Sequence, residues 1–308
     1  MATIILDCDP GIDDALAIAF AAGHPEIELA GITTVAGNVG LDKTTANALA
    51  VASFVGAGAV PVTAGCAAPL LRPARDAGRV HGESGLGGAV LPKPAREAAD
   101  GHAIDFIVDT LAAAPGEITL VATGPLTNIA LALRREPRLV RWVRDFVIMG
   151  GSAGRGNVNH AAEFNMWADP EAASVVFGAG WTVRMIGLDV TLRARATAAV
   201  QEQMREFGAL GAELLLPALA QYADAHNVAG EPPVHDVCAV VSVATPAVFT
   251  YTPALVQVET TGRLTSGMTV TDFSPSVIPN AAVATEIDPD RFWEVVLRTY
   301  GALAADIG

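Results

Sequence analysis

The chain has 308 residues, of which 51% are hydrophobic and 17% are charged, and its formal net charge is −14. This length permits one large domain or two small ones, and the acidic balance disfavours binding to a nucleic-acid backbone, so we expect a small-molecule substrate. Because the sequence has neither an apolar run of about 18 residues nor a basic leader, we expect a cytoplasmic protein without membrane association.

Short apolar segments rich in β-branched residues alternate with longer stretches of helical pattern. Strands that are buried on both faces of a parallel sheet appear as continuous apolar runs, so this alternation predicts βαβ units. The predicted strands span residues 3–7, 28–37, 60–65, 117–124, 145–151 and 182–190, and the helices between them include 41–57 and 170–179.

The pattern changes after residue 190. Helical stretches are predicted around 197–228 and 236–244, β segments at 248–260 and 267–274, and a closing helix near 290–305. No glycine-serine or charged linker separates these parts. We therefore predict a single domain over residues 1–308, an α/β fold whose open, mostly parallel sheet is flanked by helices and carries a C-terminal helical and β elaboration.

Four aspartates, Asp7, Asp9, Asp13 and Asp14, occupy the stretch DCDPGIDD behind the first predicted strand. A helix start would accommodate one of them as a cap, and the macrodipole would favour an acid there by roughly 0.3–1 kcal/mol. Two unit charges ~4 Å apart repel by about 4 kcal/mol at an effective dielectric near 20, so a helix end cannot offset the whole cluster. A divalent cation can, and oxygen donors without His or Cys favour calcium or magnesium over zinc.

Other polar residues also follow predicted strands or begin helices. Asp236 is either an ordinary N-cap or a further carboxylate ligand, and the neighbouring His235 is either an acid or a hydrogen-bond partner of a carboxylate. The backbone carbonyl of Thr123 is a candidate for completing a metal shell.

A second polar group suits sugar hydroxyls, because amides both donate and accept hydrogen bonds. The alternative interpretation of these residues is an ordinary polar loop that binds no ligand. Its members are Asn157, Asn159, His160, Glu163 and Asn165 in GNVNHAAEFN, together with Asn38. His81, in a glycine-rich loop, either approaches a ligand or only turns the chain.

The chain resembles the nucleoside hydrolases, including the inosine-uridine preferring group, from residue 3 to about residue 300. The resemblance is carried, in chain order, by DCDPGIDDALAI, ITTVAGN, HGESGLGG, ATGPLTNIALAL, VIMGG, AEFNMWADPEAA and VHDVCAV. It implies a Rossmann-like core, hydrolysis of the N-ribosidic bond of purine or pyrimidine ribonucleosides, and assembly into dimers or tetramers.

The resemblance also implies a role for particular residues. It implies a calcium ion held by Asp9, Asp14, the Thr123 carbonyl and Asp236, with Asp7 nearby and with Asp9 as the general base on a calcium-bound water. His235 would stand near the leaving base and protonate it in some members. The ribose pocket would be formed by Asp13, Asn38, Met149, Asn157, Glu163 and Asn165.

The sequence departs from the family where base selectivity is set. Inosine-uridine enzymes often carry two tyrosines in the segment that here holds Tyr222 and His226. Each of these residues either faces the helical core or reaches the base, and His226 would then hydrogen-bond or protonate it. Trp167 and Ala168 are also less usual choices, to which the sequence assigns no effect.

Two alternatives stay open at this level. A magnesium-dependent phosphohydrolase of the haloacid dehalogenase type also begins with DxD after a strand, but it needs a downstream lysine, and neither Lys43 nor Lys93 has a suitable context. A non-catalytic nucleoside or ribose binding protein would keep the sugar donors while losing a metal ligand or the base. Asp9, Asp14 and Asp236 are nevertheless all present.

Overall fold

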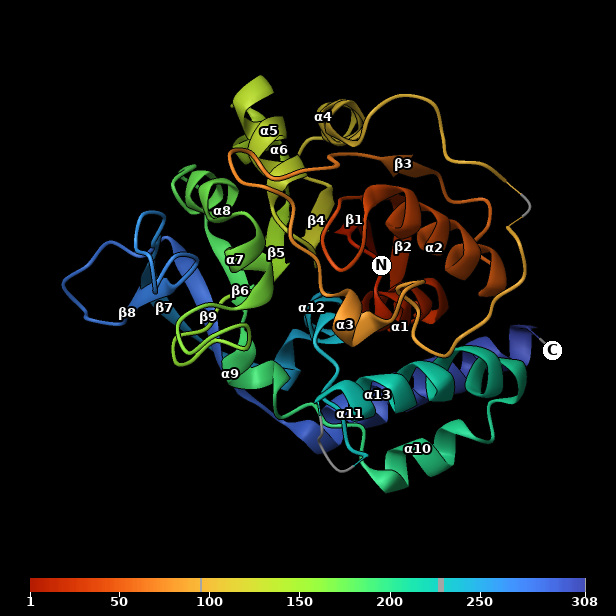
Figure 1. Cartoon of the computed structure of the whole chain (residues 1–308). Coiled ribbons are helices and arrows are strands. Elements are labelled where there is room, and N and C mark those ends of the chain that lie inside the picture. The colour runs from red at the N-terminus through yellow and green to blue at the C-terminus, as the bar shows by residue number, and fades with distance from the viewer. Residues whose placement is uncertain (95, 227–229, 308) are drawn as a thin grey trace.

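The computed structural model describes residues 1–94, 96–226 and 230–307. In this part of the chain nine strands form one sheet in the order β3-β2-β1-β4-β5-β6-β9-β7-β8 (Figure 1). The strands are β1 Ala2–Cys8, β2 Ile27–Thr34, β3 Val62–Ala64, β4 Ile118–Ala122, β5 Asp145–Met149, β6 Val183–Ile186, β7 Phe249–Val258, β8 Thr269–Asp272 and β9 Ala281–Ile287. Neighbouring strands are parallel from β3 to β9, and β7 is antiparallel to both β9 and β8. The predicted open, mostly parallel sheet is confirmed.

Helices cover both faces of the sheet. Alternate side chains of β1 point to opposite faces, so that both faces are apolar and need a cover. Ile4 and Leu6 belong to one apolar cluster, whereas Ile5 belongs to the other. The first cluster is covered by α1 Ile12–Gly23, α2 Leu41–Phe54, α10 Ala198–Met204, α11 Leu216–His226, α12 Asp236–Ala244 and α13 Pro289–Ile307. The second is covered by α4 Ala103–Ala113, α5 Thr127–Arg135, α6 Leu139–Trp142 and α8 Pro170–Phe177. In Figure 1, α10, α11 and α13 lie below the sheet and α4, α5 and α6 above it.

Two predicted elements differ from the structure. The strand predicted over 182–190 ends at Ile186, and the chain turns at Gly187 into the short helix α9, Leu188–Thr191. The helical stretch predicted over 197–228 is divided into α10, a π-helix at Leu210–Leu215 and α11. A further short helix, η2, spans Pro246–Val248 before β7.

The strand order reverses beside β1, because β2 and β3 extend the sheet on one side and β4, β5 and β6 on the other. In open α/β sheets, ligands bind beyond the carboxyl ends of the strands at such a switch point. Here the backbone N–H of Thr123, directly after β4, donates to the carbonyl of Asp7 in β1 at 2.8 Å. The fold therefore brings the aspartate cluster and Thr123 to the same edge.

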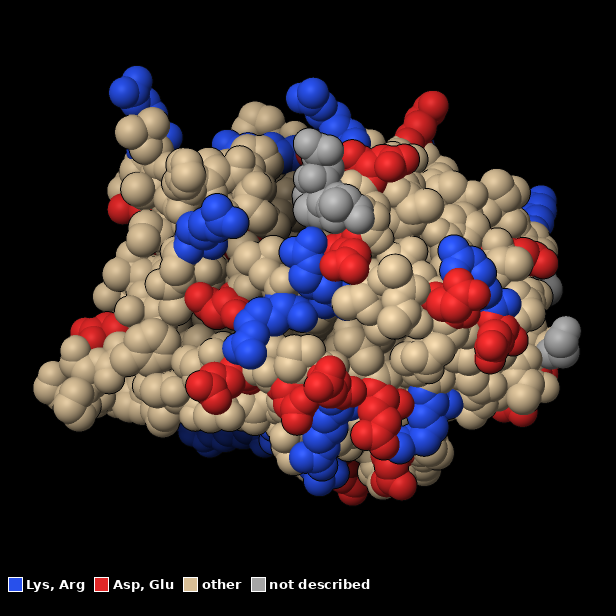
Figure 2. Space-filling view, turned by 90° about the horizontal axis from the view of Figure 1, so that it is seen from below, with Lys and Arg blue, Asp and Glu red and all other residues tan. Residues whose placement is uncertain are grey.

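The surface seen from below Figure 1 carries interspersed charges. Among the described residues on this face, Figure 2 shows acidic and basic side chains next to one another, with wide uncharged areas between them. Within the described ranges, no helix has the length and apolar character needed to span a bilayer.

Candidate active site

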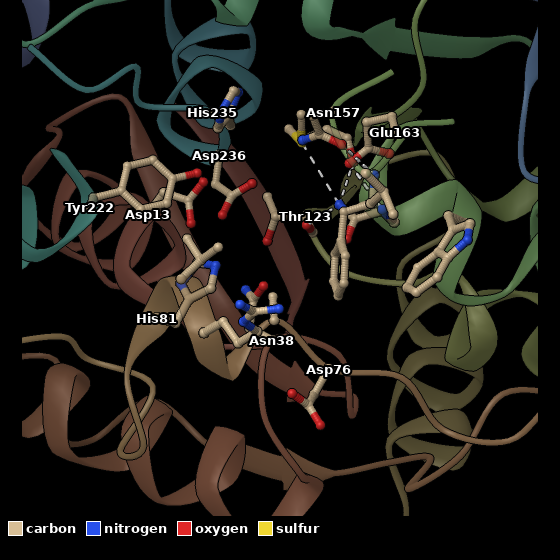
Figure 3. A pocket seen from close by; sticks show the side chains of 18 residues that line it. Asp13, Asn38, Asp76, His81, Thr123, Asn157, Glu163, Tyr222, His235 and Asp236 are labelled. Carbon is tan, nitrogen blue, oxygen red and sulfur yellow. Dashed lines mark hydrogen bonds between the residues drawn. The ribbon is translucent and has the colours of Figure 1, made fainter. Parts of the chain in front are cut away.

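A cavity of about 470 Å³ lies at the carboxyl edge of the sheet (Figure 3). Eleven of the residues singled out from the sequence line it: Asp13, Asn38, His81, Thr123, Met149, Asn157, Glu163, Asn165, Tyr222, His235 and Asp236. Asp9 and Asp14 are fully buried and are not part of this lining. The side chain of His226 lies outside the described residues, so its role stays a prediction.

Asp14 is held by donors from several parts of the chain. Its Oδ1 accepts hydrogen bonds from the backbone N–H of Asp9 at 3.3 Å and from the Thr123 hydroxyl at 2.8 Å. Its Oδ2 accepts from the backbone N–H of Gly11 and from Nδ2 of Asn38, both at 3.0 Å. Burial raises the pKa of Asp14, while the hydrogen bonds from Gly11 and Thr123 oppose this effect. The carboxylate is therefore fixed as an acceptor that joins β1, α1 and the loops after β2 and β4.

Three carboxylates meet at one point of the site. Oxygens of Asp13, Asp14 and Asp236 all lie within 4.8 Å of one another, and all three side chains are buried. Burial, followed by the neighbouring Asp14, raises the pKa of Asp13 to about 7. Burial, followed by the charge of Asp13, raises the pKa of Asp236 well above its ordinary value. A cation among these oxygens would offset both effects, so the donor set fits a hard divalent ion.

Asp9 lies beside this group in a narrow space. Its Oδ2 accepts from the backbone N–H of Asn38 at 2.7 Å, whereas its buried Oδ1 has no hydrogen-bond partner among the described residues. Gly37 and Gly124 pack directly against the carboxylate: a Cβ at Gly37 would overlap Oδ2, and one at Gly124 would lie 2.7 Å from Oδ1. A buried carboxylate oxygen without a partner is costly, so an additional ligand for Oδ1 is expected.

Asp7, near the end of β1, is bonded to the face of the sheet that α5 covers. Its Oδ1 accepts from the hydroxyl of Thr33 at 2.6 Å and from Nδ2 of Asn128 at 2.8 Å. Burial raises the pKa of Asp7 to about 7, although both hydrogen bonds lower it. Asp7 thus connects β1 to β2 and α5 and does not line the cavity.

The sugar-binding candidates are held in place by α7, Phe164–Ala168, and by the loop before it. Glu163 caps this helix: its Oε1 accepts from the N–H of Asn165 at 2.9 Å, and its Oε2 accepts from the N–H of Met166 at 3.2 Å. Nδ2 of Asn165 donates to the Thr123 carbonyl at 2.7 Å and to the Met149 carbonyl at 3.1 Å. These bonds join the ends of β4 and β5 to the predicted ribose-binding residues.

Three ring side chains form another part of the wall. The Tyr222 ring centroid lies 5.6 Å from that of His81 and 6.2 Å from that of His235. Nδ1 of His81 accepts from the N–H of Ile12 at 3.0 Å, and Nδ1 of His235 lies 2.7 Å from the hydroxyl of Thr191. Figure 3 shows Tyr222 close to Asp13, with Asn157 and Glu163 on the far side of Asp236.

Several residues of the site were not predicted from the sequence. The cavity is also lined by Asp76, Ala77, Arg79, Val80, Val158, Phe164 and Trp167. Gly37 and Gly124 could have been predicted from the sequence, because each is adjacent to a candidate site residue, Asn38 or Thr123, at the end of a predicted strand. The stretch from Asp76 to Val80 carries no motif, and only long-range contacts bring it to the cavity.

The comparisons with known proteins agree over nearly the whole chain. A family model described as inosine-uridine preferring nucleoside hydrolase matches residues 4–294. An inosine-uridine preferring nucleoside hydrolase of Leishmania major is 48% identical over 302 residues, which are 96% of each chain. A non-specific ribonucleoside hydrolase of Klebsiella pneumoniae is 47% identical over 291 residues, covering 94% of this chain and 95% of that one.

A solved structure matches the fold as well. The purine-preferring ribonucleoside hydrolase from Gardnerella vaginalis superposes with a TM-score of 0.92 at 35% identity, covering 98% of this chain and 99% of that one. The names of these relatives differ in base preference: inosine-uridine, non-specific and purine. The relatives therefore agree in fold and in reaction, but they differ in the base that they prefer.

Proposed function

Because the chain belongs to the inosine-uridine preferring nucleoside hydrolase family, whose members hydrolyse ribonucleosides, we propose that it does so with a calcium ion held at the end of β1. The observation that carries this proposal is the close group of Asp13, Asp14 and Asp236, next to Oδ1 of Asp9, for which the described part of the chain offers no hydrogen-bond partner. Family membership also decides against the haloacid dehalogenase alternative.

Asp9, Asp14, the Thr123 carbonyl and Asp236 are the proposed calcium ligands. Their donor atoms are all oxygen, as calcium prefers, and 6–8 such atoms complete its shell, about half of which water and ribose hydroxyls would supply. When bound, the ion would orient the ribose hydroxyls and lower the pKa of a water molecule. The Thr123 carbonyl already accepts one hydrogen bond, from Asn165, and a carbonyl oxygen has a second lone pair for a cation.

The protein residues carry the proposed chemistry as follows. Asp9 takes a proton from the attacking water, whose oxygen forms a bond to C1′ of the ribose while the C1′–N bond breaks. Positive charge develops on the ribose ring, and the buried carboxylates stabilise that charge more than they stabilise the neutral substrate. His235 donates a proton to the leaving nitrogen where the base requires one.

The ribose is proposed to lie between the carboxylates and the α7 loop. Asp13, Asn38, Asn157, Glu163 and Asn165 would bind its hydroxyls, with Met149 against the ring. Glu163 and Asn165 are pre-positioned by bonds to backbone groups, which reduces the entropy lost on binding. The base would then face His81, Tyr222 and His235.

The side chains that face the base would set the base preference. We propose that Tyr222, and His226 if it reaches the cavity, decide between purine and pyrimidine nucleosides. The differing names of the relatives are consistent with a preference set by few residues. From the family resemblance we further propose a dimer or tetramer in the cytoplasm, which size-exclusion chromatography with light scattering and cell fractionation would test.

Ribose release tests the central proposal. Inosine, adenosine, guanosine, uridine and cytidine are supplied to the chelator-stripped protein, before and after calcium is restored. We expect little release without the ion and recovery with it, and the ranking of the bases gives the preference. Release that is indifferent to calcium contradicts the metal assignment, and no release from any of these nucleosides favours a non-catalytic binding protein.

A further inference from the structure

One wall of the cavity is formed by a part of the chain with little regular structure. Between β3 and the short helix α3, Gly78–His81, residues 65–77 form neither helix nor strand. This stretch ends in the residues that line the cavity from Asp76 to His81. The wall is attached through backbone bonds, such as that from the Ala77 N–H to the Asn38 carbonyl at 3.1 Å, and through the side-chain contacts of the stretch before it.

After a backbone bond from the Leu70 N–H to Oδ2 of Asp169 at 2.9 Å, the first side-chain hydrogen bonds of this stretch are made by Arg72. Its Nη2 donates to Oε1 of Glu171 at 2.7 Å, and its Nε donates to Oε2 at 3.0 Å. Nη2 also donates to the carbonyl of Thr260, beyond β7. Arg72 therefore fastens the segment to α8 and to the region after β7, four positions before the wall begins.

The second attachment, Arg75, lies directly beside the wall. Its guanidinium carbon stands 4.1 Å from the centroid of the Trp167 ring, and its Nη1 donates to the Trp167 carbonyl at 3.1 Å. Trp167 also lines the cavity. One side chain of α7 thus contacts both the cavity and the residue that precedes Asp76.

Trp167 is the fixed partner in this contact. It lies in α7, and behind it the chain between β7 and β8 packs so closely that a Cβ at Gly267 would lie 2.6 Å from the Trp167 Cα. Arg75, in contrast, belongs to the irregular stretch. The contact therefore transfers the position of α7 to the wall, and not the reverse.

We propose that Arg75 and Trp167 are positioning residues that hold the wall from Asp76 to His81 against a bound nucleoside. This inference rests on the proposed function of the cavity. It also assigns a role to Trp167, whose presence the sequence alone left without one. The contact would strengthen binding of the nucleoside, because this wall lines the cavity that is proposed to hold the ribose and the base.

The contact should affect binding more than the chemical step. Asp9 and Asp14 are held by bonds to Asn38, Gly11 and Thr123, and the wall reaches this group through the bond from the Ala77 N–H to the Asn38 carbonyl at 3.1 Å, a backbone contact that involves neither Arg75 nor Trp167. His81 has its own bond from the Ile12 N–H. A looser wall therefore weakens the ground state and the transition state alike, which raises KM while kcat is kept.

The experiment compares Arg75→Met, Trp167→Leu and the double variant with the wild type in the presence of calcium. Arg138→Met is the matched control, because the Arg138 guanidinium also lies over a tryptophan, 4.9 Å from the Trp142 ring centroid, outside the cavity lining. Arg75→Lys keeps the charge and loses the planar stack. The measurements are kcat and KM for inosine and uridine, with a thermal unfolding curve for each variant.

We expect Arg75→Met to raise KM for both nucleosides by about tenfold, with kcat within about twofold of wild type. The KM of Arg75→Lys should lie between that of the wild type and that of Arg75→Met. The effects should be less than additive in the double variant, because Trp167→Leu already removes the ring under Arg75 and leaves only the bond of Arg75 to the backbone carbonyl of residue 167. Arg138→Met should leave both constants unchanged.

Other results overturn the inference. An unchanged KM in Arg75→Met, a fall in kcat alone, or fully additive effects in the double variant each contradict positioning through Trp167. If Arg75→Met does not fold, Arg75→Lys carries the same comparison. A wild type that releases no ribose would refute the proposed function, whereas an active wild type with an unaffected Arg75→Met refutes only the positioning role.

Discussion

The hydroxyl of Thr191 lies 2.7 Å from Nδ1 of His235, and neither side chain is more than 5% exposed. The segments that carry them are joined as well, because the N–H of Val234 donates to the Ala194 carbonyl at 2.9 Å. Thr191 is fully buried and is not part of the cavity lining, so we infer that this bond turns Nδ1 away from the cavity and Nε2 towards it. The bond fixes the ring orientation of the proposed acid.

Thr191→Val should therefore impair nucleosides whose base must be protonated as it leaves. Valine keeps the shape and removes the hydroxyl, so His235 loses its fixed orientation. We expect inosine turnover to fall by about 10–100-fold, less than the roughly 10²–10⁴-fold that general acid catalysis contributes, because His235 itself is retained. Turnover of 4-nitrophenyl riboside, whose leaving group needs no proton, should change by less than about twofold. Steady-state rates with the two substrates measure the difference.

Two variants control this prediction. Thr191→Ser restores the hydroxyl and should recover most of the inosine activity. His235→Ala should show the same selectivity as Thr191→Val, with a larger loss. An equal loss on both substrates in His235→Ala would remove His235 from the role of acid, and an equal loss only in Thr191→Val would reduce Thr191 to a packing residue.

Asp9→Asn should keep the fold and nucleoside binding but lower kcat by about 10²–10⁴-fold, because an amide cannot accept the proton of the attacking water. The Asn38 N–H that bonds to Oδ2 of Asp9 can still bond to an amide oxygen. Calorimetric titration with a nucleoside separates binding from turnover. Near-normal turnover would exclude Asp9 as the base.

The regular part of the fold was readable from the sequence because it depends on local patterns. Continuous apolar runs such as residues 3–7 and 145–151 became β1 and β5 with small shifts at their ends. The strand predicted over 182–190 was too long, since Gly187 ends it and a helical turn follows. The strand order, with β4 beside β1, depends on contacts between distant residues and has no local signal.

The candidate site divides in the same way. The aspartates of the DCDPGIDD stretch were conspicuous because four charges in eight positions require an explanation. Thr191 and Arg75 gave no such signal, because a threonine after a strand and an arginine in a loop are ordinary residues. Their roles appear only when the fold places His235 and Trp167 next to them.

Calcium should stabilise the protein more at neutral pH than at acidic pH. Burial raises the pKa of Asp7 and of Asp13 to about 7, above the ordinary value of 3.8. A folded-state pKa above the unfolded one contributes stability that is fully present below the unfolded pKa and is lost as the pH rises towards the folded pKa. The melting temperature of the chelator-stripped protein should therefore fall between about pH 5 and about pH 7.5.

Adding calcium should counter that fall, because the ion favours the ionised carboxylates and binds the folded state. Melting curves with and without the ion, recorded across this pH range, should diverge as the pH rises. A gap that stays constant or narrows would contradict the proposed coupling between the ion and the buried acids.

Gly37→Ala should reduce turnover although position 37 carries no reactive group. A Cβ there would overlap Oδ2 of Asp9, and Cδ of Pro125 would lie 2.8 Å away on another side, so the carboxylate has to move. A displacement of about 1 Å in a reacting group costs up to about 10²-fold in rate, and we expect a loss in kcat of that order. The melting temperature should change little. Gly58→Ala is the control, because its Cβ would meet only ordinary contacts, the nearest at 3.5 Å from Ser53. If Gly37→Ala turned over nucleosides as fast as Gly58→Ala, the position of the Asp9 carboxylate would not limit the reaction, and its role as the base would need another explanation.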